Sequence, residues 1–174
     1  MSLETKRIKE LFGYARTLTK EQGVGVMAGR AVGFFKRRFF GKKARYLPSK
    51  QTLETQRADA AARADGWPTI SILTPLYNTP PLFLQQFLDS VQAQTAPNWQ
   101  LVLVDASDDA HPDVGETVRT RAAQDKRIVY AKIENKGIAA NTNEAAKLAA
   151  CEYLALADHD DMLAPHAVYC MSKA

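Results

Sequence analysis

The chain has 174 residues, of which 46% are hydrophobic and 24% are charged. This length and composition are typical of a soluble globular protein and exclude fibrous and disordered classes. The formal net charge of +4 is unevenly distributed, because residues 1–50 carry 13 Lys and Arg against 3 Glu, whereas residues 51–174 carry 10 basic and 16 acidic residues. A basic arm therefore precedes an acidic domain, and we expect the two parts to have different roles.

The two cysteines, Cys151 and Cys170, match no zinc-ligand spacing, so we interpret them as reduced thiols of a cytosolic protein. No apolar run approaches the roughly 20 residues that span a bilayer. The N-terminal basic residues are not followed by the continuous apolar segment of a signal peptide. These features predict a cytoplasmic protein.

Residues 1–46 are predicted to form a basic amphipathic helical extension, and residues 47–67 a polar, Ala-rich helix or linker. Within the extension, segment 26–45 combines two Phe-Phe pairs with a cluster of Lys and Arg. One interpretation is peripheral contact with the cytoplasmic face of the inner membrane. The other is a helix whose aromatic side chains pack on the following domain while its charges stay solvated. No nucleic-acid motif accompanies the basic residues, so we expect no nucleic-acid partner.

From residue 68 onward, short β-branched runs alternate with helical patterns. The order β-α-β-α-β-α-β-α implies right-handed crossovers and a mostly parallel α/β sheet covered on both faces. Ligands of such sheets bind at the carboxyl ends of the strands. The expected strands are 69–74, 99–104, 127–133 and 152–157, and the expected helices are 80–91, 112–124, 138–150 and a last one from 165.

The last expected strand, which we take to be buried, is followed by Asp158-His159-Asp160-Asp161. Three carboxylates in four residues repel one another unless a cation lies among them, and hard oxygen ligands suit Mg²⁺ or Mn²⁺. A substrate diphosphate would complete the coordination of such an ion. The alternative is a solvated acidic turn in which Asp161 caps the last helix.

Two further polar segments follow strands. Asp105 can accept hydrogen bonds from a nucleotide base or ribose, or can simply cap the next turn. Residues 135–137 place a turn glycine before a helix, where an anionic ligand is favoured, although an ordinary capped loop explains the pattern as well.

Five segments in this order and spacing resemble glycosyltransferase family 2, and the resemblance extends over residues 68–174. They are I-S-I-L-T-P-L-Y-N, F-L-D-S-V-Q-A-Q-T, L-V-L-V-D-A-S-D, N-K-G-I-A-A-N-T-N-E-A and E-Y-L-A-L-A-D-H-D-D. The resemblance implies the GT-A fold, a Rossmann-like, mostly parallel sheet flanked by helices, here with its C-terminal part missing.

The resemblance also implies roles for residues after the first two strands. Thr74, Pro75 and Tyr77 match the loop that lines the nucleotide base. Asp105 matches the acidic residue that recognises the base, which favours a UDP-sugar as donor.

After the later strands, Asp158 and Asp160 match the D-x-D motif. Asp158 is implied to lie nearer the ribose and sugar, and Asp160 nearer a Mg²⁺ or Mn²⁺ ion. Lys136, Gly137 and Asn141 match a segment that approaches the nucleotide-sugar.

The D-H-D-D-x-L-x-P-H variant is similar to bacterial enzymes that build O-antigen, rhamnan and related polysaccharides. The implied function is an inverting glycosyltransferase that transfers a sugar from a nucleoside diphosphate-sugar to a surface polysaccharide or lipid-linked glycan. Because members of the family continue further, we expect the catalytic base beyond Ala174 and no activity from this chain alone. The alternative function is a non-catalytic nucleotide-sugar-binding or membrane-docking module that a partner chain completes.

Overall fold

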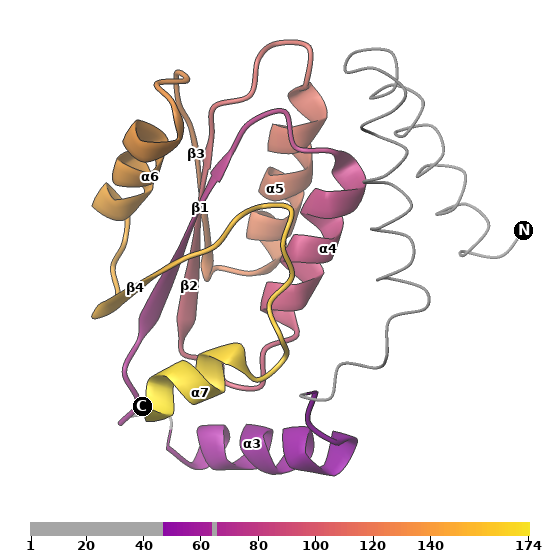
Figure 1. Ribbon diagram of the computed structural model, residues 1–174, viewed down its shortest axis with the longest axis vertical. Coiled ribbons are helices and arrows are strands. Elements are labelled where there is room, and N and C mark those ends of the chain that lie inside the picture. Colours follow the sequence, from indigo (N-terminus) through magenta and orange to yellow (C-terminus); the bar gives the residue numbers. More distant parts are fainter. Residues whose placement is uncertain (1–46, 64–65) are drawn as a thin grey trace, which may run out of the picture. The chain divides into compact units, whose positions relative to one another are not determined.

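The computed structural model describes residues 47–63 and 66–174, so the expected basic helices of residues 1–46 lie outside the described residues. The described strands form one parallel sheet in the order β3-β2-β1-β4 (Figure 1). They are β1 (Ile70–Leu76), β2 (Trp99–Asp105), β3 (Ile128–Lys132) and β4 (Tyr153–Leu156). All three strand pairings are parallel, which confirms the α/β class and the alternating order expected from the sequence.

Helices lie on both faces of this sheet. In Figure 1, α4 and α5 cover one face and α6 covers the other, while α3 and α7 lie by the ends at which the strands begin. Proline occupies the first turn of α4 and of α5, where its missing N–H costs no hydrogen bond. The helices are α3 (Lys50–Ala62), α4 (Pro81–Gln92), α5 (Pro112–Gln124), α6 (Ile138–Lys147) and α7 (Ala167–Lys173).

The larger part of the core lies between the sheet and helices α4 and α5. Leu84, Phe87 and Leu88 recur at helical spacing on α4 and are all 0% exposed. Truncating Phe87 to alanine would cost about 3–5 kcal/mol, as is usual for a large side chain in a close-packed core. On the other face, Val102 and Val104 pack with residues of α6. The central strand β2 is thus buried on both faces, which explains its continuous apolar sequence.

The expectation that the fourth strand is buried is wrong. Strand β4 is an edge strand whose Tyr153, Leu154 and Leu156 are 59%, 55% and 74% exposed. The reason is that α6 packs against β1 and β2, and that among residues 47–63 and 66–174 β4 has a neighbouring strand, β1, on one side only. The free backbone groups of such an edge can pair with a further strand.

The helix ends differ slightly from the expected ones. Helix α3 begins at Lys50, because the side chain of Ser49 caps it by accepting a 3.1 Å hydrogen bond from the amide of Thr52. The last helix begins at Ala167 instead of residue 165, since residues 165–166 form a turn. Among the described residues, no helix is long and apolar enough to cross a membrane.

Candidate functional site

The polar segments that follow the strands lie along one edge of the sheet, as expected. Leu76 at the end of β1 is paired with Asp105 at the end of β2, which in turn is paired with Lys132 at the end of β3. Strand β4 runs in the same direction, and its last residue, Leu156, is paired with Leu73. We call this end of the sheet, where the strands finish, the carboxyl rim.

Asp105 is the most buried acidic group at the carboxyl rim, with 1% exposure. Its Oδ1 accepts a 2.9 Å hydrogen bond from the amide of Ser107. Its Oδ2 accepts hydrogen bonds from the hydroxyl of Tyr130 at 2.9 Å and from the ammonium of Lys132 at 3.3 Å. Lys132 also donates a 2.6 Å hydrogen bond to the carbonyl oxygen of Ser107. These donors compensate the cost of burying the carboxylate.

Helix α5 closes over this cluster at Gly115. A Cβ at this position would lie 2.5 Å from the hydroxyl oxygen of Tyr130 and 3.3 Å from Oδ2 of Asp105, so only glycine fits without movement. On the outer side, Arg119 donates a 3.4 Å hydrogen bond to the same hydroxyl. Burial, followed by the hydrogen bond and charge of Asp105, raises the pKa of Tyr130 to about 12.

Asn78 joins the loop after β1 to the loop after β2. Its amide donates a 2.9 Å hydrogen bond to the hydroxyl of Ser107, and its side chain exchanges hydrogen bonds with Asp108 at 2.8 and 3.1 Å. The backbone of Asn78 is left-handed, with φ of 48°, a conformation that asparagine tolerates better than most residues. Hydrogen bonds from His111 and then Asn78 lower the pKa of Asp108.

The three residues expected to line a base differ in accessibility. Tyr77 is 49% exposed at the carboxyl rim and Pro75 is half-buried. Thr74 is 0% exposed, and its hydroxyl has no hydrogen-bond partner in the described part of the chain. Tyr77 is therefore the most accessible surface of this loop.

The segment before α6 is organised by Asn141, which is 3% exposed. Its Oδ1 accepts a 3.1 Å hydrogen bond from the amide of Lys136, and its Nδ2 donates one of 3.1 Å to the side chain of Asn135. Gly137, with φ of 85°, precedes the helix in a conformation that favours glycine. The exposed Lys136 and the first turn of α6 follow directly from β3, at the carboxyl rim.

The acidic turn after β4 exposes its carboxylates. Asp158, Asp160 and Asp161 are exposed, and their carboxylates make no hydrogen bond or ion pair with the described residues. No three His, Cys, Asp or Glu side chains in the described ranges are placed to hold a metal together. The donor set thus fits an ion that takes one or two carboxylates from the protein and its other ligands from substrate and water, as Mg²⁺ usually does. It does not fit a closed protein cage.

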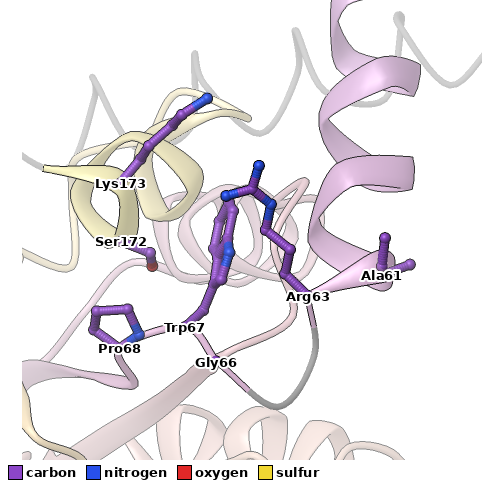
Figure 2. A pocket seen from close by; sticks show the side chains of 8 residues that line it. Ala61, Arg63, Gly66, Trp67, Pro68, Ser172 and Lys173 are labelled. Carbon is purple, nitrogen blue, oxygen red and sulfur yellow. The ribbon is translucent and has the colours of Figure 1, made fainter.

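A hollow of about 600 Å³ lies at the opposite end of the sheet, beside the residues that precede β1 (Figure 2). Arg63, Trp67 and Lys173 line it, and none of the site residues expected from the sequence does. The ammonium of Lys173 lies 5.4 Å from the centre of the Tyr169 ring.

Several residues of the carboxyl rim were not expected from the sequence. Tyr130 and Lys132 are two positions apart on β3 and therefore lie on the same face of the strand, which could have been predicted from the sequence. The close approach at Gly115 depends on how α5 packs, and no local pattern reveals it.

The parallel α/β sheet and the polar loops along its carboxyl rim place the protein in the class of open-sheet α/β proteins, whose ligands bind at the carboxyl ends of the strands. Sequence comparison narrows this class: the model of Glycosyl transferase family 2 matches residues 71–173, and the chain belongs to this family.

Two much longer bacterial proteins are similar to the same part of the chain. An uncharacterized protein of Sinorhizobium fredii, y4gI, is 38% identical over 120 residues, which cover 68% of this chain and 13% of that protein. The O-antigen biosynthesis protein RfbC of Myxococcus xanthus is 30% identical over 115 residues, which cover 66% of this chain and 9% of that protein. The chain thus spans about a tenth of the length of these two relatives.

Solved structures confirm the GT-A fold. S. aureus TarS 1-349 in complex with UDP-GlcNAc matches with a TM-score of 0.51 and 22% sequence identity, over 60% of this chain and 30% of that chain.

Proposed function

We propose that this chain forms the donor-binding part of an inverting glycosyltransferase. The enzyme would transfer a sugar from a nucleoside diphosphate-sugar, with UDP favoured, to a surface polysaccharide or lipid-linked glycan. The relatives support this class of acceptor, since they include an O-antigen biosynthesis protein and the minor teichoic acid biosynthesis protein GgaB of Bacillus subtilis. The TarS complex with UDP-GlcNAc supports the class of donor.

One observation carries the proposal: unpaired carboxylates and a buried polar cluster share the carboxyl rim. Asp158 and Asp160 have no partner for their negative charge among the described residues, and Asp105 anchors the polar cluster two strands away. Carboxylates two positions apart in one turn repel one another, and a cation bound between them would remove this repulsion. A nucleoside diphosphate would bring such a cation to the rim.

In this proposal Thr74, Pro75 and Tyr77 line the base, and Tyr77 offers its ring as a stacking surface. The cluster around Asp105 selects the base. Asp158 holds the ribose or sugar.

Asp160, with Asp158, would hold the Mg²⁺ or Mn²⁺ ion, which would neutralise charge on the departing diphosphate. Asn141 fixes the turn at Lys136 and Gly137, so the first turn of α6 and the ammonium of Lys136 favour the anionic diphosphate.

A cytoplasmic location is also part of this proposal, because the proposed donors are nucleoside diphosphate-sugars. A lipid-linked acceptor would explain a peripheral contact of the basic segment 26–45 with the inner membrane, where each nearby Lys or Arg adds about 1 kcal/mol.

Calorimetry with UDP and Mn²⁺ tests the proposal on the full chain. We expect heat of binding that is lost or at least ten-fold weaker in Asp160→Ala, since the ion links protein and diphosphate. Glu116→Ala, which removes an exposed carboxylate from α5, is the control and should bind as the unsubstituted chain does. Binding that persists unchanged in Asp160→Ala would refute the metal role.

A further inference from the structure

The segment between β4 and α7 is held by two polar side chains at the C-terminal end of α4. In Figure 1 this segment runs from the end of β4 past α4 to the start of α7. Ser90 lies in the last turn of α4 and Gln94 follows the helix directly, and each is 8% exposed. Both belong to residues 87–95, which have no part in the donor site described above.

The side-chain amide of Gln94 joins this segment to α4 and α7. Its Nε2 donates hydrogen bonds to the carbonyl oxygens of Ser90 at 3.0 Å and Ala164 at 2.8 Å. Its Oε1 accepts a 2.9 Å hydrogen bond from the amide of Val168. Val168 lies in the first turn of α7, where backbone amides have no partner within the helix, so Gln94 caps α7 from a different element. A glutamine amide suits this role because it supplies two donors and an acceptor on one group.

Ser90 holds the same segment closer to the acidic turn. Its hydroxyl donates a 2.7 Å hydrogen bond to the carbonyl oxygen of Phe87 and accepts one of 3.1 Å from the amide of Leu163. On the other side of the acidic turn, the amide of Ala157 donates a 3.1 Å hydrogen bond to the carbonyl oxygen of Leu73 in β1. Residues 158–162 therefore lie between two fixed points, one provided by the sheet and the other by α4.

We propose that Ser90 and Gln94 are positioning residues of the acidic turn: they fix the end of the turn that the sheet does not hold, and so keep the carboxylates of Asp158 and Asp160 ready for a divalent cation. This assignment rests on the proposed function and deepens it, since it names groups that act on the affinity for the ion without touching it. The physical reason is preorganisation, because carboxylates on a turn that is already held lose less conformational freedom when they bind.

The test measures Mn²⁺ binding to the full chain in the presence of UDP, by electron paramagnetic resonance. Gln94→Met keeps the length of the side chain but removes its hydrogen bonds. We expect Mn²⁺ affinity to fall about ten-fold, as is usual when an outer support of metal ligands is lost. Ser90→Ala should weaken Mn²⁺ binding in the same direction, and it decides the question if Gln94→Met does not fold. In both variants the amides of residues 158–163 should exchange hydrogen faster without any metal.

Gln92→Met is the matched control, because it makes the same substitution two positions earlier. Gln92 accepts a 2.6 Å hydrogen bond from Arg121 of α5, so its loss affects the contact between α4 and α5 and should leave Mn²⁺ affinity unchanged. Thermal unfolding shows which variants are folded.

Two results would overturn this inference alone: an unchanged Mn²⁺ affinity in folded Gln94→Met and Ser90→Ala variants, or an equal loss of affinity in Gln92→Met. If the unsubstituted chain binds no Mn²⁺ with UDP, the proposed metal role fails and this inference fails with it.

Discussion

Substituting Gly115 by alanine should disturb the buried cluster at the carboxyl rim. In most helix interiors this change stabilises a protein, since alanine is favoured over glycine by about 1 kcal/mol. Here the new Cβ would lie 2.5 Å from the hydroxyl oxygen of Tyr130, so that hydroxyl must move. Losing its hydrogen bond to the carboxylate of Asp105 costs about 1.5–3 kcal/mol. We therefore expect Gly115→Ala to lower the free energy of unfolding by about 0.5–2 kcal/mol.

Urea denaturation of four proteins measures this effect: the unsubstituted chain, Gly115→Ala, Tyr130→Phe and the double variant. Without the hydroxyl the shortest contact is removed, and the Cβ keeps tight contacts of 3.0 Å to a guanidinium nitrogen of Arg119 and 3.3 Å to Oδ2 of Asp105, so Gly115→Ala should be less destabilising in the Tyr130→Phe background. The two substitutions should thus show a coupling of about 0.5–3 kcal/mol. If Gly115→Ala instead stabilises the unsubstituted chain by the full helix preference, the close contact between α5 and β3 is wrong.

Three other changes test the loops and strand β3 that frame the site, two of them at the carboxyl rim and one at the start of β3. Asn78→Ala should lower the free energy of unfolding by about 1–3 kcal/mol, because it removes hydrogen bonds and leaves alanine in a left-handed conformation. Asn78→Gly should cost less, because glycine accepts that conformation. Equal losses for the two variants in urea denaturation would argue against the backbone strain. In a spectrophotometric titration Tyr130 should ionise at about 12, and Asp105→Asn should lower that pKa, since a negative neighbour is removed; no change would contradict the contact. The Arg127 guanidinium lowers the pKa of Asp125 to about 2, so this pair stabilises the fold fully above the unfolded pKa of about 4 and loses its contribution as the pH falls toward 2. Arg127→Met should flatten the acid side of the curve of stability against pH, and an unaltered curve would count against the pair.

The sequence predicts the order and type of the elements because each strand is a short β-branched or apolar run and each helix has its own periodic pattern. The prolines that begin α4 and α5 mark helix starts directly. The burial of β4 was predicted wrongly for a physical reason: its apolar residues look the same in a covered strand and in an edge strand. Only the strand order shows that Leu156 lies at the edge.

The candidate site, like the fold, can be predicted from the sequence only in part. The position of Asp105 at the carboxyl rim follows from local sequence and the parallel sheet. Its enclosure by Tyr130 and Lys132 depends on the pairing of β2 with β3, which brings together residues 25 and 27 positions apart. A sequence pattern can identify a chemically useful residue, but the partners that bury it come from register and packing.

Mapping UDP on the full chain by NMR, in the presence of Mg²⁺, tests the central claim most directly, because the amide shifts report where the nucleotide binds. The proposed donor site predicts changes concentrated in residues 74–78, 105–108 and 158–160, at the carboxyl rim. Changes confined to the hollow beside Arg63 and Lys173, at the other end of the strands, would contradict it, as would no changes at all at saturating nucleotide.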